Sequence, residues 1–341
     1  MYAEVGLLTH NLRVRGDDSS LASEYGGHIM AKGNYVKTYI ADVELKYMGQ
    51  AYQVNRHPVT FMEAEHLGGS YVERVAIWEG FNRAIAVHTS NCMNLANNVA
   101  YNVMGHNFFL QDGIEMNNRF AYNLAIATRA SHSLLNSDQT PASFWITNPR
   151  NNFIGNHAAG SEMYGFWFDL PDHPTGQSAT DDVCPPGERL GSFKDNVAHS
   201  NGRYGLRLFS QHIPRQFPCK AISEEPAEGA ADPEGDAFAA NPPIPAKYTD
   251  FLSFKNQRAG VIAERIGAVQ FERITTADNI EAGIEISLPG FAPLKDGWVD
   301  GARIFGFTAN AGDMTKYGST RGIVTPQKDS FTFKNVKFIN F

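Results

Sequence analysis

Residues 102–115, NVMGHNFFLQDGIE, place a histidine and two carboxylates around the apolar run FFL. His106 precedes this run, and Asp112 and Glu115 follow it. A further histidine, His88, directly follows the similar apolar stretch AIAV. On one face, a histidine and two carboxylates would supply the acid and the base or nucleophile that glycosidic cleavage requires. We therefore predict that these four residues are catalytic.

Two other interpretations of this cluster stay open. The carboxylates of Asp112 and Glu115 are oxygen ligands of the kind that Ca²⁺ prefers, which makes Ca²⁺ the one cofactor that the sequence suggests. Alternatively, Asp112 and Gly113 form an ordinary turn, because Asp-Gly is a common turn dipeptide. Glu115 would then be solvated, and His106 would be a hydrogen-bonded corner residue.

The elements that position these residues follow a repeated template. A short strand-like stretch leads through polar residues to a small or turn-compatible residue nine positions on, and then to an apolar strand. Segments of this kind start at Val75, Asn98, Asn156, Asn196, Phe251 and Ile274, and a stretch from Asn123 fills a gap. The shortest spacings between segments lie in the low twenties, which indicates a solenoid.

Short strands at this period, without amphipathic helices, predict an all-β fold: a right-handed parallel β-helix with loop excursions. The small residues of the template are expected at corners with positive φ. Asn98, Asn123, Asn156 and Asn196 are expected to stack as a ladder of side-chain amides. A β-propeller is disfavoured because its blades repeat at about 40 residues or more. We assign residues 1–341 to a single β-helix domain.

Two segments interrupt the repeats. Residues 169–191 are dense in Pro, Gly and Asp and are predicted to leave the solenoid as an excursion. Residues 222–247 are acidic and rich in Ala and Pro, which predicts a flexible loop.

Aromatic residues lie where the first excursion begins, in the stretch GFWFDLPDHPTG. Trp167 is predicted to offer its ring to a sugar, with Asp172 and His173 binding sugar hydroxyls. The alternative is that alternate members of Phe166–Phe168 fill the core, because successive side chains of a strand point to opposite faces.

Charge and hydropathy exclude some classes of function. The net charge is −7, whereas nucleic-acid binding requires a concentrated field of Lys and Arg. No apolar run reaches the roughly 18 residues of a membrane span. The start of the chain lacks a signal-peptide pattern, which predicts either a cytosolic protein or a piece of a longer one.

The three cysteines leave the redox compartment open. Cys184 and Cys219 lie beside prolines, and one disulfide between them suits an oxidising environment. Cys92 would then be an unpaired thiol. The sequence is equally compatible with three reduced cysteines.

Several long segments resemble a known family. GHNFFLQDGIE, FWITNPRNNFIGNHAAGSEMYGFWFDLPDHPTG and the terminal RGIVTPQKDSFTFKNVKFINF are similar to the β-helix region that follows the eight-glycine domain. That region occurs in the family of cell-surface hyaluronidases and the cell migration-inducing hyaluronan-binding protein, and in the related fibrocystin-like receptors. The resemblance implies an interior piece of an extracellular or cell-surface protein. Its partner would be a glycosaminoglycan-like polysaccharide or another surface protein.

The resemblance implies two different roles. One is a carbohydrate-associated module that binds or depolymerises hyaluronan, because His106, Asp112 and Glu115 match the family pattern GHxFFLxDGIE. The other is a non-catalytic structural or adhesive spacer. Where the hyaluronidase branch has two histidines in a PVHFH strand, this chain has Thr60 and Met62, and this departure weakens the catalytic case.

Overall fold

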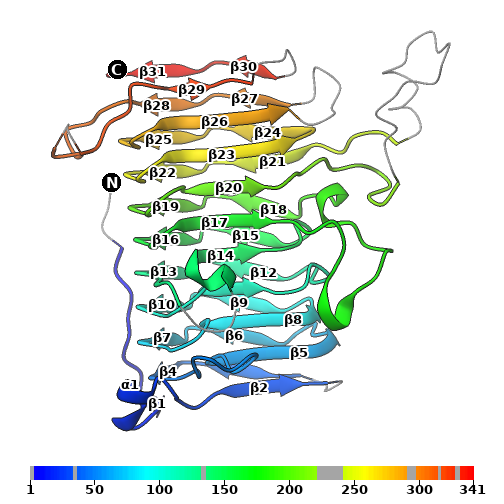
Figure 1. The fold of residues 1–341 in the computed structure, drawn as a ribbon, viewed down its shortest axis with the longest axis vertical. Coiled ribbons are helices and arrows are strands. Elements are labelled where there is room, and N and C mark those ends of the chain that lie inside the picture. The colour runs from blue at the N-terminus through cyan, green and yellow to red at the C-terminus, as the bar shows by residue number, and fades with distance from the viewer. Residues whose placement is uncertain are drawn as a thin grey trace.

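The computed structural model describes residues 4–33, 37–131, 136–220, 241–289, 297–313, 316–326 and 331–341. In these residues the chain winds through three long sheets, and every strand pairs in parallel with its equivalent one coil away (Figure 1). Most of the predicted acidic loop, residues 222–240, lies outside the described residues. The arrangement confirms the predicted parallel β-helix.

Each coil contributes one strand to each sheet. Sheet 1 contains β1 (Leu12–Arg15), β4 (Val43–Lys46), β7 (Ala76–Trp78), β10 (Val99–Tyr101), β13 (Leu124–Ile126), β16 (His157–Ala159), β19 (Val197–His199), β22 (Leu252–Phe254), β25 (Thr275–Ala277), β28 (Arg303–Phe305) and β31 (Lys337–Ile339). Sheet 2 contains β2 (Ile29–Lys32), β5 (Val59–His66), β8 (Ile85–Asn91), β11 (Phe108–Leu110), β14 (Ala142–Ile146), β17 (Tyr164–Asp169), β20 (Leu206–Phe209), β23 (Ala259–Ile266), β26 (Ala282–Pro289) and β29 (Ile323–Val324). Sheet 3 contains β3 (Tyr39–Ala41), β6 (Tyr71–Glu73), β9 (Asn94–Ala96), β12 (Arg119–Ala121), β15 (Asn152–Ile154), β18 (Ser192–Lys194), β21 (Ala246–Thr249), β24 (Val269–Glu272), β27 (Trp298–Asp300) and β30 (Thr332–Lys334).

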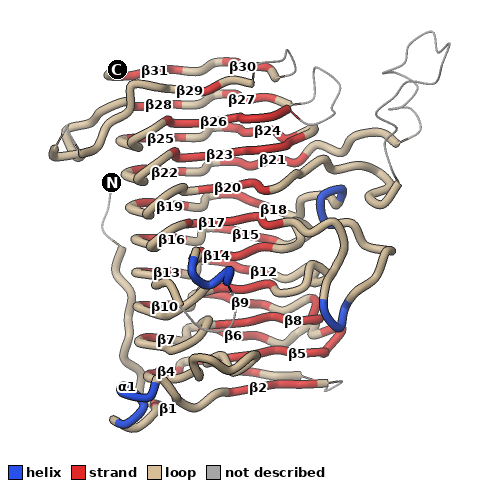
Figure 2. The backbone as a smooth tube through the Cα atoms, in the orientation of Figure 1, coloured by secondary structure: helices blue, strands red, loops and turns tan. Residues whose placement is uncertain are grey.

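Helices are few and short in the described residues (Figure 2). They are α1 (Ser19–Ser23), η1 (Asn136–Gln139), η2 (Gly176–Ser178) and η3 (Pro185–Gly187). None of them is long and apolar enough to cross a membrane.

Strand alternation divides the side chains of sheet 2 between the core and the outer face. Phe108, Phe144 and Phe166 point into the core and stack coil on coil, with ring centroids 4.8 and 4.5 Å apart. The next residue of two of these strands, Trp145 and Trp167, belongs to a second apolar cluster on the outer face. Each coil therefore repeats the same inward and outward positions.

The predicted asparagine ladder is confirmed. The side-chain amides of Asn98, Asn123 and Asn156 each donate to the amide oxygen one coil on, at 2.9, 3.0 and 3.1 Å, the last rung ending at Asn196. All four asparagines are buried. The ladder satisfies backbone groups in the turn between sheets 3 and 1, which burial would otherwise leave unpaired.

The template's glycines have a different role from the one predicted. Gly165, Gly205, Gly260 and Gly283 do not have positive φ. A Cβ on Gly165 would instead lie 2.6 Å from the carbonyl oxygen of Gly205, one coil away. A Cβ on Gly205 or on Gly260 would lie 2.7 Å from the carbonyl oxygen of the glycine one coil further on. These positions are small because neighbouring coils approach closely there. Positive φ occurs at other corners, such as Asn97 at 57°.

The segment from Asn123 departs from the predicted spacing. After β13 the chain forms an insertion that includes η1, and the sheet 2 strand β14 begins only at Ala142. At the other interruption, β17 ends at Asp169 and β18 begins at Ser192, so the connection between them covers the segment predicted as an excursion, residues 169–191. By contrast, β21 begins inside the segment predicted as residues 222–247.

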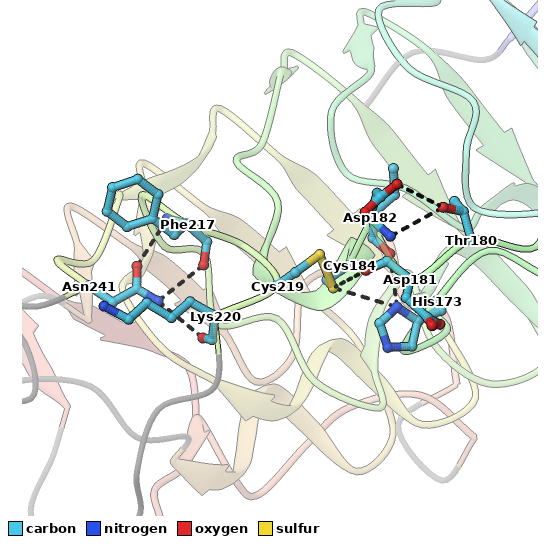
Figure 3. The surroundings of a disulfide bond; sticks show 10 residues. His173, Thr180, Asp181, Asp182, Cys184, Phe217, Cys219, Lys220 and Asn241 are labelled. Atoms are coloured by element: carbon cyan, nitrogen blue, oxygen red, sulfur yellow. Dashed lines mark hydrogen bonds between the residues drawn. A yellow bond between two sulfur atoms is a disulfide. The ribbon is translucent and has the colours of Figure 1, made fainter.

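A disulfide ties the excursion to the next loop. Cys184 is bonded to Cys219 (Figure 3), which selects the oxidised alternative. Cys92 is a free thiol. On the same loop, the side chain of Asn241 bonds the backbone of Phe217 at 3.0 and 3.1 Å. The disulfide thereby joins the loop that follows β17 to the loop that follows β20.

Candidate functional site

His88, Asp112 and Glu115, three of the four predicted catalytic residues, lie on or beside the outer face of sheet 2. On β8, His88 faces outward opposite Met62 of β5, and Thr60 lies opposite Ala86. The two positions at which this chain departs from the hyaluronidase-like pattern are therefore direct neighbours of the His88 strand.

His88 and Asp112 form a buried pair. His88 Nε2 lies 2.5 Å from Asp112 Oδ2, and each side chain is 5% exposed. The approach is poorly directed for a hydrogen bond, so we describe the contact as an ion pair. Ser178 of the excursion donates to Asp112 Oδ2 at 3.0 Å, and its hydroxyl lies 2.5 Å from Thr89 Oγ1. The excursion thus covers the pair.

The charge state of His88 follows from this environment. Burial acts to lower the pKa of His88, but the adjacent Asp112 carboxylate, with Glu115 and Glu63 farther away, outweighs burial and raises it. His88 Nδ1 has no hydrogen-bond partner in the described residues. The His88 imidazole can therefore be held protonated by Asp112, while its Nδ1 atom makes no hydrogen bond.

Replacing Asp112 by asparagine is expected to lower the pKa of His88, because the neighbouring negative charge is lost. In the native protein this charge stabilises the fold below the unfolded His pKa of about 6.5, and the stabilisation is lost as pH rises through the raised folded pKa. The destabilisation by Asp112→Asn, measured by chemical denaturation, should therefore be larger at pH 6 than at pH 9. An equal loss at both values would contradict the ion pair.

Glu115 positions Asp112 and is itself enclosed. Its carboxylate accepts the backbone N–H groups of Thr89 at 2.8 Å, Asp112 at 3.1 Å and Gly113 at 2.9 Å. Burial raises the pKa of Glu115, and these N–H bonds oppose the shift. Because backbone donors occupy its oxygens, Glu115 fixes the turn that holds Asp112.

The predicted Ca²⁺ site receives little support from this arrangement. In the part of the chain that the structure describes, no group of three His, Cys, Asp or Glu side chains is arranged to hold a metal. The Glu115 carboxylate accepts backbone N–H groups, and the Asp112 carboxylate is paired with His88 and accepts the Ser178 hydroxyl.

The structure separates His106 from this cluster. In register, it lies level with Arg83, which precedes β8, whereas His88 lies in the middle of that strand. Its Nδ1 accepts the backbone N–H of Ala142 at 3.0 Å, and its ring lies 4.1 Å from that of Trp145. Burial and the nearby Arg83 charge hold the pKa of His106 well below its usual range, so the ring is neutral.

A second buried ion pair lies beside His106. Arg83 binds Asp138 through two bonds of 2.9 and 3.0 Å, and its guanidinium lies 3.7 Å from the Phe109 ring centroid. His57 shares this region, and burial with the Arg83 charge lowers the pKa of His57 to about 3. The arginine within FNRAIAV is a detectable signal, because this charge lies just before an apolar strand, β8. Asp138 carried no such signal.

The predicted sugar-binding residues do not form one group. Trp167 faces outward, as alternation predicts, but it is only 7% exposed because Tyr164 and Arg207 pack against its ring. Asp172 accepts a bond from the Gln211 side chain at 3.4 Å. His173 lies at the disulfide, with Nδ1 3.2 Å from the Val183 carbonyl oxygen (Figure 3).

A cavity of about 600 Å³ lies on another side of the solenoid. It is bounded by the segment from Glu4 to His10, by strand residues of sheet 1 such as His157, and by residues of the turns between sheets 3 and 1, including Arg74 and Tyr122. Because none of the predicted site residues lines it, we do not assign it to the candidate site.

Comparison with known proteins agrees with this architecture. The sequence profile of the CEMIP beta-helix matches residues 24–206. Fibrocystin-L of Mus musculus is 31% identical over 99% of this chain, and the cell surface hyaluronidase CEMIP2 of Homo sapiens is 31% identical over 95%. The cell migration-inducing and hyaluronan-binding protein of Mus musculus is 33% identical over 87%. The chain spans 9%, 27% and 25% of these proteins, respectively. With more than half of its length matched by the profile, the chain belongs to the CEMIP beta-helix family.

Proposed function

We propose that this chain is a carbohydrate-associated module of an extracellular or cell-surface protein, and that it handles a hyaluronan-type glycosaminoglycan on the outer face of sheet 2. The observation that carries the proposal is the His88–Asp112 pair, with its unused ring nitrogen, on the sheet face that also presents Trp167. Two relatives are named for hyaluronan, which supports this class of ligand.

The pair has the chemistry of a general acid. The Asp112 carboxylate stabilises the protonated imidazole of His88, leaving Nδ1–H as the group that would protonate a leaving glycosidic oxygen. Glu115 and Ser178 orient Asp112. Because Ser178 covers the pair, a sugar hydroxyl must replace the serine hydroxyl, or the excursion must move aside.

One observation favours a second candidate function, that of a structural or adhesive spacer. His88, Asp112 and Glu115 are all buried, and their contacts join the excursion to two neighbouring coils. Such a cluster would stabilise a rigid solenoid without any reaction. The similarity to fibrocystin-L over nearly the whole chain suits this alternative equally well.

The experiment that separates the two is size analysis of hyaluronan incubated with the chain, with Ca²⁺ and with a chelator. We expect the polymer to shorten and His88→Gln to slow this by about 100-fold, the usual scale for losing a general acid. His66→Gln is the matched control, because His66 is an exposed histidine on the neighbouring strand β5. Unchanged polymer length in all samples, with intact folding by circular dichroism, would favour the spacer.

A further inference from the structure

Asp169 is an unassigned carboxyl group on the outer face of sheet 2. It ends β17, two residues after Trp167, and lies opposite Phe209 of β20. Its side chain is half-buried, and no hydrogen bond to its carboxyl group is found among the described residues. Burial raises the pKa of Asp169 to about 6, and the charge of Arg207 offsets only part of this shift. A carboxyl group that is neither bonded nor fully solvated is available to a ligand.

Arg207 forms a fixed part of the outer face of sheet 2 beside Asp169. Its guanidinium donates to Glu264 at 2.8 Å and to the Tyr164 hydroxyl at 3.2 Å. The same group lies 4.7 Å from the Trp167 ring centroid and 4.2 Å from that of Phe209. With its donors engaged and its plane held against aromatic rings, Arg207 is a rigid part of the surface.

Three neighbouring strands complete the surface. β17, β20 and β23 lie side by side in sheet 2 (Figure 1). Continuing the pairing of Leu208 with Ala263 by one residue places Glu264 of β23 next in the row after Asp169 and Phe209. At about 4.8 Å per strand, the backbones of Asp169 and Glu264 are about 10 Å apart, which leaves room for one sugar ring between the two side chains. The Glu264 side chain is 27% exposed, and the Phe209 ring is partly exposed between them.

We propose that Asp169, Phe209 and Glu264 form a subsite for an uncharged sugar residue, such as an N-acetylhexosamine. The two carboxyl groups would accept hydroxyl or amide hydrogens, and the ring of Phe209 would pack against the sugar face. The subsite rests on the proposed carbohydrate function and extends it to a named sugar class.

Charge selects an uncharged sugar over a uronate. The charge of Arg207 is already matched by Glu264, so Asp169 adds negative charge to the surface when ionised. A uronate carboxylate placed there would be repelled, whereas hydroxyl and acetamido groups would find acceptors. In an alternating polymer such as hyaluronan, the N-acetylhexosamine is therefore the unit assigned to this position.

The test measures binding of a neutral N-acetylglucosamine tetrasaccharide to the full chain by calorimetry. We expect Asp169→Asn to weaken binding about tenfold, the scale of one charge-assisted hydrogen bond. Asp195→Asn is the matched control, since Asp195 is exposed in the turn between sheets 3 and 1. Native binding should tighten between pH 5 and pH 7, as the Asp169 carboxyl ionises beside Arg207 and becomes the stronger acceptor. Asp169→Asn should remove that pH dependence.

The proposal is overturned if the tetrasaccharide does not bind, if Asp169→Asn binds it as tightly as the native chain, or if the pH dependence persists in that variant. These results are independent of hyaluronan cleavage. Tetrasaccharide binding that depends on Asp169, together with unchanged hyaluronan length, would contradict the proposed acid and leave this subsite supported.

Discussion

Replacing Asp138 by asparagine is expected to lower the free energy of unfolding by about 3–5 kcal/mol. Asp138 and Arg83 are both buried and joined by two hydrogen bonds, so the substitution leaves the Arg83 charge inside the protein without its counter-charge. The contact of that guanidinium with Phe109 cannot replace an anion. Guanidinium denaturation at pH 7 measures the change.

A double variant distinguishes loss of charge balance from loss of packing. Arg83→Met combined with Asp138→Leu removes both charges and keeps much of the apolar volume, so it is expected to be more stable than Asp138→Asn. The exposed substitution Asp195→Asn should change the unfolding free energy by less than about 0.5 kcal/mol. A change of that small size in Asp138→Asn would contradict a structural role for the pair.

Asn156→Ala is expected to cost about 2–4 kcal/mol, because Asn156 is an interior rung of the ladder. Its amide donates to the Phe120 carbonyl oxygen and to Asn196, and its oxygen accepts the backbone and side-chain N–H groups of Asn123. Alanine leaves these buried partners unsatisfied, at about 1–3 kcal/mol each before relaxation.

Hydrogen exchange can localise this effect along the solenoid. Because each coil contacts chiefly its neighbours, Asn156→Ala should speed amide exchange most in β13, β16 and β19 and little in the terminal coils. Asn310→Ala replaces an exposed asparagine whose side chain makes no bond among the described contacts, and it serves as the control. Uniform acceleration along the whole chain would indicate global unfolding and contradict the local role.

The excursion links the stability of the solenoid to its proposed chemistry. It places Ser178 over Asp112, and the bond between Cys184 and Cys219 anchors the same excursion to the loop after β20. The ion pair of His88 is therefore enclosed by a segment that is far from it in sequence. This arrangement explains why residues matching a hyaluronidase-like pattern are buried rather than open to solvent.

The sequence alone determined the periodic features of this protein. Strand alternation predicted that Phe166–Phe168 divide between the core and the outer face, and the structure places Phe166 and Phe168 in the core. Recurrence at one template position identified the ladder from Asn98 to Asn196. Such features are predictable because they depend on local geometry that each coil repeats. The role of the template's glycines was not predictable in this way, since the close approach of neighbouring coils is a property of packing.

Only the tertiary structure decided which polar groups meet. Arg83 pairs with Asp138, 55 residues away across an insertion, and Asp112 bonds Ser178, 66 residues away across the excursion. Residues of insertions have no fixed register with the coils, so sequence spacing carries no information about these contacts. The same register that joins His88 to Asp112 places His106 level with Arg83, before β8 begins, because strand pairing and not nearness in sequence sets side-chain distances.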